Sequence, residues 1–236
     1  MKINFITSLL FFLPFLSTAH GYWLELDGTG KLGTEVKVKI FFGEYENNLR
    51  EQGPRLAGMK EFRSYLIDPD GQQLTIELVQ TQTCWEGRFK PTKAGNYQVF
   101  GVNDTREVQD LTSHGLGIIR PIVYLRANYW VGEKSNVSTA KPQTDIDILD
   151  RNEGGQLILN TFLRQKPFAK AKLTVLNPQG WEKNLVTNEV GTAHFIPSGP
   201  GLYIIESEQI DKIPGQYRGK DYPVVRIAYS LSIQVD

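Results

Sequence analysis

Cysteine and histidine are scarce in this chain of 236 residues, which has one cysteine, Cys84, and three histidines. A single cysteine excludes an internal disulfide and any metal cluster built from several cysteines. An excess of positive charge is also absent, because 26 lysines and arginines balance 26 aspartates and glutamates. With no surplus of cations to neutralise phosphates, we do not expect a nucleic acid as a partner.

Long hydrophobic runs are absent as well, except at the N-terminus. Residues 1–19 have a short basic start, an almost wholly apolar stretch and a small-residue end, the pattern of a signal peptide. The apolar stretch is shorter than the roughly 20 residues of a membrane-spanning helix, and Pro14 interrupts it. We therefore predict cleavage after Ala19. The mature protein would begin at His20, be periplasmic or secreted, and not itself span the membrane.

Helical periodicity is nearly missing, and alternation with a period of two replaces it. Residues 225–235 are apolar at every second position, and residues 36–40 repeat the pattern. The tetrapeptides at 68–71 and 177–180 are typical tight turns that contain proline and glycine. Short strands joined by tight turns predict an all-β protein built of β-sandwiches.

A faint internal repeat indicates two such units. The strand and turn at 65–71 correspond to 173–180, and the Phe-x-Pro to Gly-x-Tyr pattern of 89–97 recurs at 195–203 with the same spacing. Each unit is close to the roughly 100 residues of an immunoglobulin-like sandwich. We predict two tandem immunoglobulin-like β-sandwich domains, with bounds 20–131 and 143–236, joined by a polar linker at 132–142.

The residues at the predicted cleavage point resemble a known family. Ala19 to Glu25 carry an Ala-His-x-x-Trp junction, and segments 36–45 and 62–71 continue the likeness. The chain resembles the bacterial periplasmic domain-of-unknown-function family associated with nickel and cobalt uptake, and residues 180–231 are similar to members from Bacteroidetes-type bacteria. The resemblance implies a periplasmic β-sandwich protein linked to transition-metal handling.

His20 is the first candidate metal ligand. After cleavage it would carry a free α-amine and an imidazole, and these two nitrogens can close a chelate ring on one ion. An α-amine has a pKa of roughly 7.7 to 8.0, so a metal displaces its proton at modest cost. Nitrogen ligands of this kind suit Cu(II) or Ni(II). The competing interpretation is a frayed terminus whose histidine is incidental.

A further ligand has to come from one of the two other histidines. His114 lies in a polar segment beside Gly115, and loop positions of this kind often present ligands, so His114 is the preferred partner of His20. A solvated loop histidine is the competing interpretation. His194 occupies the repeat position of Arg88 and is expected on the outer face of a strand, which makes it a reserve candidate.

Acidic side chains could add oxygen ligands. The candidates are Glu25, Glu44, Glu46, Asp104, Glu107 and Asp110. Keeping strand edges and loops soluble is the competing role for each of them. Cys84 is expected to be a small buried hydrophobe rather than a ligand.

These features together predict a function. We expect a periplasmic protein that binds a divalent transition metal (nickel, cobalt or copper) at His20 and His114 and supports its uptake or delivery, with a membrane uptake transporter or outer-membrane receptor as partner. No nucleophile elbow, zinc-protease motif or phosphate-binding loop is present, so we do not expect an enzyme. The alternative is a carbohydrate- or protein-binding β-sandwich module without metal. A minor alternative is a copper-dependent polysaccharide oxidase, a class whose mature chains also begin His-Gly-Tyr.

Overall fold

The computed structural model describes residues 20–133 and 140–236. The predicted signal peptide and residues 134–139 of the predicted linker lie outside the described residues. The described chain is nearly all β, with two short 3-10 helices, η1 (Gly53–Met59) and η2 (Thr112–His114). The prediction of an all-β sandwich fold is therefore confirmed. No helix in these ranges is both long and apolar enough to cross a membrane.

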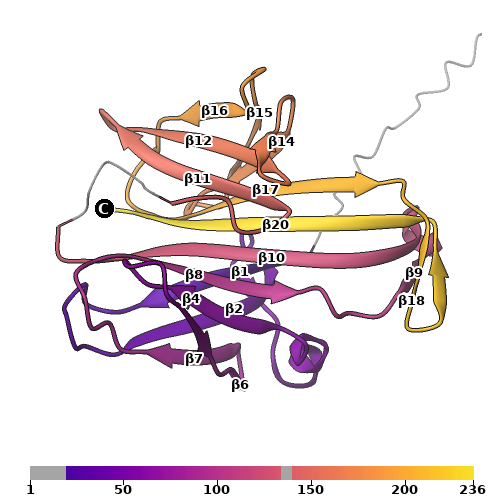
Figure 1. The fold of residues 1–236 in the computed structure, drawn as a ribbon, viewed down its shortest axis with the longest axis horizontal. Helices are drawn as coiled ribbons and strands as arrows, with labels where there is room; N and C mark the ends of the chain where they lie inside the picture. Colours follow the sequence, from indigo (N-terminus) through magenta and orange to yellow (C-terminus); the bar gives the residue numbers. More distant parts are fainter. Residues whose placement is uncertain (1–19, 134–139) are drawn as a thin grey trace, which may run out of the picture.

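One sheet of nine strands runs through the whole molecule (Figure 1). Its order is β15-β14-β17-β20-β10-β8-β4-β5, and β9 pairs with one end of β10. The bounds are β4 Arg63–Ile67, β5 Gln73–Ile76, β8 Gly95–Asn103, β9 Gln109–Leu111, β10 Gly117–Val131, β14 Lys172–Leu176, β15 Glu182–Val186, β17 Gly201–Asp211 and β20 Val224–Val235. Neighbours are antiparallel except at the centre, where β10 and β20 run parallel with Ile122 opposite Ile227.

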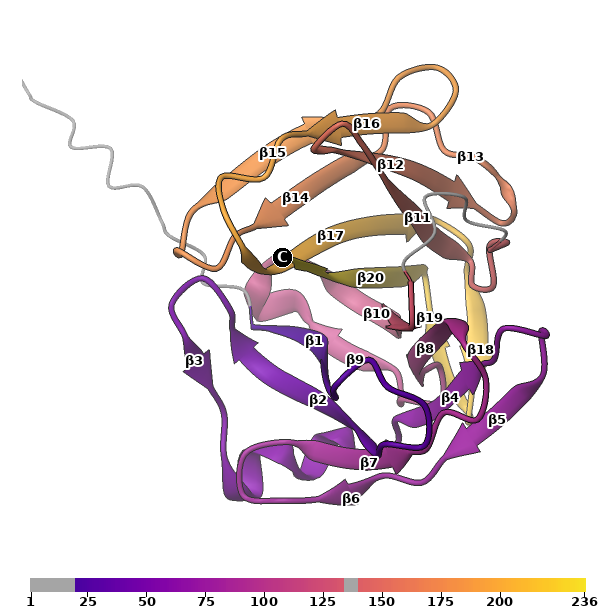
Figure 2. The same cartoon turned by 90° about the vertical axis from the view of Figure 1, so that its left-hand side faces the viewer.

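Two smaller sheets cover this central sheet (Figure 2). The first has the order β1-β2-β7-β6 with β3 beside β2, and the second has β11-β12-β13 with β16 beside β12. Their bounds are β1 Gly21–Asp27, β2 Val36–Glu44, β3 Leu49–Arg50, β6 Val79–Gln80, β7 Trp85–Phe89, β11 Ile146–Glu153, β12 Gln156–Leu163, β13 Lys166–Pro167 and β16 Thr192–Phe195. A short hairpin, β18 (Gly215–Tyr217) and β19 (Lys220–Tyr222), stands apart from these sheets.

The two hydrophobic cores lie on opposite faces of the central sheet. Val123 and Leu125 of β10 belong to the core under the first covering sheet, whereas Ile122 belongs to the core under the second. Because successive side chains of a strand point to opposite faces, this alternation places one core on each side of β10. The predicted domain bounds remain a prediction. The two halves of the chain, before and after the predicted linker, meet in one continuous sheet.

The internal repeat carries matching turn contacts. Asp68 Oδ1 accepts hydrogen bonds from the amides of Asp70 and Gln72, and Asn177 Oδ1 accepts them from the amides of Gln179 and Trp181. In both turns a short side-chain acceptor satisfies two amides of its own loop. The repeat seen in the sequence is therefore a repeat of local structure.

A tyrosine closes the next loop in each half. The Tyr97 hydroxyl accepts from the amide of Lys93 at 3.0 Å and donates to the Lys93 carbonyl at 3.1 Å. The Tyr203 hydroxyl accepts from the amide of Ser198 and donates to the Gly199 carbonyl, both at 3.0 Å. Each hydroxyl thus ties the loop before its strand to the sandwich core.

A fully buried ion pair joins the halves. Arg126 of β10 and Asp147 of β11 lie 2.8 Å apart, and both side chains are 0% exposed. The Tyr229 hydroxyl of β20 donates to Asp147 at 2.8 Å and accepts from the amide of Ile148 at 3.1 Å. Buried charges are costly unless paired and hydrogen-bonded, so this network favours the one arrangement of the three strands that completes it.

Aromatic packing provides a second contact between the halves. Trp23 and Phe41 stack in a cluster that also contains Leu176 and Ile204 from the other half. The Tyr45 hydroxyl donates to the carbonyl of Leu202 at 2.5 Å. Cys84 belongs to the same cluster and is 4% exposed, as expected for a small buried hydrophobe.

The buried pair predicts a large loss of stability when one partner is removed. Asp147→Ala leaves Arg126 charged and unpaired, and should lower the free energy of unfolding by about 3–5 kcal/mol. Tyr229→Phe removes one hydroxyl from the same network and should cost about 1 kcal/mol. Urea denaturation of both variants measures the two values. An Asp147→Ala loss no larger than that of Tyr229→Phe would contradict the role of the pair.

The matched tyrosines predict matched effects. Tyr97→Phe and Tyr203→Phe should each destabilise by about 1–2 kcal/mol, because each leaves loop amides without their acceptor. The control is Tyr65→Phe, since the Tyr65 hydroxyl has no hydrogen-bond partner within 20–133 or 140–236. Thermal unfolding monitored by circular dichroism compares the three. Clearly unequal losses for Tyr97 and Tyr203 would show that the two loops are not equivalent.

Candidate functional site

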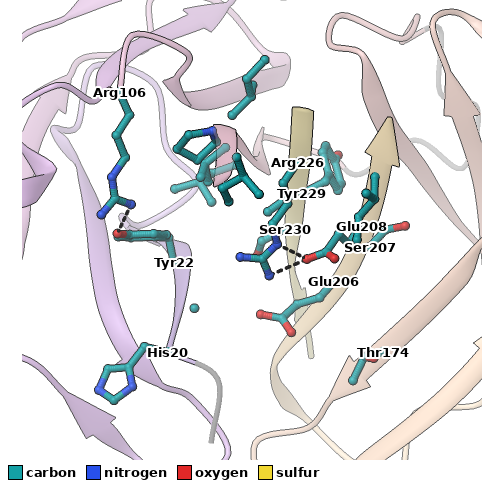
Figure 3. A pocket seen from close by; sticks show the side chains of 18 of the residues that line it. His20, Tyr22, Arg106, Thr174, Glu206, Ser207, Glu208, Arg226, Tyr229 and Ser230 are labelled. Atoms are coloured by element: carbon teal, nitrogen blue, oxygen red, sulfur yellow. Dashed lines mark hydrogen bonds and ion pairs between the residues drawn. The ribbon is translucent and has the colours of Figure 1, made fainter. Parts of the chain in front are cut away.

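A pocket of about 680 Å³ lies where the two halves meet, beside β1. Within the described chain β1 pairs only with β2, so its other edge faces the central sheet. Residues of both halves line the pocket, with His20 and Tyr22 on one side and Glu206 and Arg226 on the other (Figure 3). The space opens because the first covering sheet ends at β1 while the central sheet continues through β20, β17 and β14.

His20 lies at this pocket, and each of its ring nitrogens faces a carboxylate. Nε2 lies 2.8 Å from Glu51 Oε1, and Nδ1 lies 3.4 Å from Glu44 Oε1. Both glutamates are 7% exposed, whereas the imidazole is 31% exposed. The ring also packs at 5.2 Å from the ring of Phe42. His20 is therefore held in place rather than frayed, with its ring reachable from solvent.

The hairpin of β2 and β3 positions the two carboxylates. Glu44 ends β2, and the Asn47 side-chain amide donates to its Oε2 at 2.9 Å, which leaves Oε1 facing His20. The backbone amide of Glu51 donates to the Phe42 carbonyl at 2.8 Å. A Cβ at Gly43 would lie 2.1 Å from the Leu49 carbonyl oxygen, so glycine allows the two strands to approach this closely.

Glu51 is the best-anchored group of this cluster. Its carboxylate accepts hydrogen bonds from His20 and from Arg55 of η1, the latter at 2.5 Å. The hydrogen bond from His20 and the Arg55 guanidinium lower the pKa of Glu51 against the opposing effect of burial. Glu51 therefore stays ionised over a wider acidic range than an ordinary glutamate.

The other histidines occupy different places. His114 ends η2, between β9 and β10, and its side chain is not among those that the structure describes. Its partnership with His20 therefore remains a prediction. His194 lies on β16 opposite Ile158 and is exposed, as expected for an outer strand position. No group of three or more His, Cys, Asp or Glu side chains that could hold a metal was found in the described part of the chain.

Sequence reasoning named Glu44 among several acidic candidates and missed Glu51 and Glu206. Glu51 lies 31 residues from His20 and reaches it only through the hairpin. Glu206 is brought to β1 by the parallel pairing of β10 with β20, a contact between distant strands. No local pattern in the sequence signals either contact.

Glu206 lies directly against the start of β1. A Cβ at Gly21 would come within 2.8 Å of Glu206 Oε1, so a larger residue there would displace the end of this side chain from its present position. Burial, with a smaller contribution from the negative charges of Glu46 and Glu182, raises the pKa of Glu206 to about 7.

Comparisons with known proteins place the chain in no family. A scan against protein-family models found no match, and a search of curated proteins found none. A solved structure titled "Biofilm associated protein - BSP domain" is 12% identical with a TM-score of 0.23, covering 87% of this chain and 29% of its own. The chain spans less than a third of that structure.

Proposed function

We propose that the mature chain binds a divalent transition metal ion (nickel, cobalt or copper) at His20 and supports its uptake or delivery. The observation that carries the proposal is the orientation of the His20 ring between Glu51 and Glu44. Predicted cleavage after Ala19 adds the α-amine of the same residue.

Glu51 selects the ring nitrogen that is free to bind a metal. An ionised carboxylate only accepts hydrogen bonds, so Nε2 must carry the ring hydrogen and donate this hydrogen bond to Glu51. In a neutral imidazole this leaves the lone pair on Nδ1. Metal-binding histidines commonly donate their other ring N–H to a carboxylate, which fixes the tautomer and the ring orientation. Nδ1 is also the nitrogen nearest the α-amine, so the two can chelate one ion.

The position of Glu44 fits an oxygen ligand. A nitrogen and an oxygen that are each about 2.1 Å from one ion lie about 3.0 Å apart at the 90° angle of a square-planar site and about 3.4 Å apart at a tetrahedral angle. The distance from His20 Nδ1 to Glu44 Oε1 is 3.4 Å. The donor set of amine, imidazole and carboxylate, with no thiolate, suits nickel, cobalt or copper. His114 stays the candidate for a further nitrogen ligand.

Partial exposure of the imidazole supports delivery rather than permanent storage. The His20 ring is 31% exposed, so an incoming protein or small chelator can reach a bound ion. A membrane uptake transporter or an outer-membrane receptor is the partner that this role requires.

The terminal chelate predicts that metal affinity depends on where the chain begins. Titration calorimetry compares Cu(II), Ni(II) and Co(II) binding to protein that starts at His20 and to protein with one extra residue before His20. The extra residue moves the amine away, and should weaken binding by more than the 10- to 100-fold typical of losing an outer-shell partner. His114→Ala then tests the further ligand. Equal or absent binding in both proteins would overturn the proposal and favour a binding module without metal.

The two glutamates predict different losses. Glu51→Ala should weaken metal binding by about 10- to 100-fold because it removes the group that orients the ring, and Glu51→Gln should restore most of the affinity because its amide oxygen still accepts from Nε2. Glu44→Ala should cost at least as much as Glu51→Ala. Glu35→Ala, at an exposed residue paired with Arg88, is the matched control. If Glu35→Ala weakens binding as much as the other two, the effect is one of overall charge.

A further inference from the structure

The pocket beside β1 holds a carboxylate without a cationic partner. The Glu206 side chain makes no hydrogen bond or ion pair in the described part of the chain, and the Arg226 guanidinium nearby is bound to Glu208, with Nε 2.5 Å from Oε2. The Glu206 side chain points into the pocket (Figure 3). Its negative charge is therefore left for a ligand to balance.

The same pocket holds a guanidinium without an anionic partner. Arg106 Nη1 donates to the Tyr22 hydroxyl at 3.2 Å, and the side-chain oxygen of Gln109, in its favourable orientation, accepts from Nη2 and Nε at 2.9 and 3.0 Å. The nearby carboxylates of Asp104 and Glu107 are paired with other cations, Arg63 and Lys220. Across the residues that the structure describes, Arg106 has neutral partners and no carboxylate.

These two charges do not satisfy each other. Arg106 comes from the first half of the chain and Glu206 from the second, and they lie on opposite sides of the pocket (Figure 3). No ion pair joins them. The pocket volume of about 680 Å³ lies within the range of about 300–1,000 Å³ that is usual for small-molecule sites.

A buried hydroxyl adds a third unsatisfied group. Ser230 lines the pocket, is 4% exposed, and its Oγ has no hydrogen-bond partner among the residues described. Buried polar groups are normally paired, and one that lines a cavity is a natural contact for a ligand. The raised pKa of Glu206 has a related origin, because the nearby Arg226 guanidinium, which is bound to Glu208, offsets its burial only in part.

We propose that this pocket binds a small organic zwitterion, such as a short peptide, with its ammonium group at Glu206 and its carboxylate at Arg106. A simple amine would leave the guanidinium unpaired, and a simple acid would leave the glutamate unpaired. Guanidinium and carboxylate match in shape, since the two can form paired hydrogen bonds. Lys172 also lines the pocket, but it is exposed and forms no ion pair with Glu206.

The site does not depend on the proposed metal function. It uses neither ring nitrogen of His20, and Glu44 and Glu51 are not among the residues that line the pocket. The test therefore uses metal-free, chelator-treated protein, in which failure of metal binding and failure of zwitterion binding are separate results.

Calorimetry on the whole mature chain provides the test, with glycylglycine, triglycine and 6-aminohexanoate as probes of increasing length. At least one should bind, and acetylating its amine or amidating its carboxylate should each weaken binding by about 10- to 100-fold. Absence of binding by every probe at millimolar concentration would overturn the proposal. Equal binding of free and blocked forms would do the same.

Variants locate the binding. Glu206→Gln and Arg106→Gln should each cause a comparable loss, and blocking the amine should have little additional effect on Glu206→Gln. Glu189→Gln and Arg151→Gln, at exposed positions paired with Lys170 and Glu153, are the matched controls. Thermal unfolding confirms that all four variants are folded. Unchanged affinity in both pocket variants, or equal losses in the controls, would contradict the assignment.

Discussion

The parallel pairing of β10 with β20 determines the rest of this architecture. It joins two antiparallel sheets into one, and places each hydrophobic core on a different face of the result. Both strands are buried on both sides at the centre, where Arg126, Asp147 and Tyr229 complete a buried polar network. Because that network draws on β10, β11 and β20, a shift of one half against the other would break it.

The same pairing leaves a pocket on each face of the central sheet, and the two pockets differ in their charged groups. Corresponding strands of the two halves follow in the same order outward from the central pair of β10 and β20. The space beside β1 therefore has a counterpart beside the start of β11, with a volume of about 570 Å³. In that counterpart both arginines are paired, Arg63 with Asp104 and Arg164 with Asp211, and the carboxylate of Asp145 forms no ion pair within the described residues. The pocket beside β1 instead leaves Arg106 and Glu206 unpaired. Repetition of the fold therefore explains the cavities, and sequence divergence between the halves explains their different chemistry.

Local patterns and long-range contacts differ in how well the sequence reveals them. Alternation in 225–235 and the matched turns at Asp68 and Asn177 are properties of short segments, so the strands and the repeat could be predicted. The parallel contact between β10 and β20 joins strands about 100 residues apart, and no residue pattern specifies it. The partners of His20 depend on a hairpin, and those of Glu206 on that parallel contact. The sequence could therefore locate the candidate site at His20, but it could not identify Glu51 and Glu206 as residues around it.

His20, Gly21 and Tyr22 all line the pocket, and each makes a different contact. His20 faces Glu44 and Glu51, so it belongs to the proposed metal site. Gly21 has no Cβ, which lets Glu206 approach the backbone of β1 from the other half. The Tyr22 ring stacks on Phe42, and its hydroxyl oxygen accepts a hydrogen bond from Arg106. A larger residue at Gly21 would push Glu206 away without touching either ring nitrogen of His20. The short segment His20-Gly21-Tyr22 thus links the proposed metal site to the pocket proposed for a zwitterion.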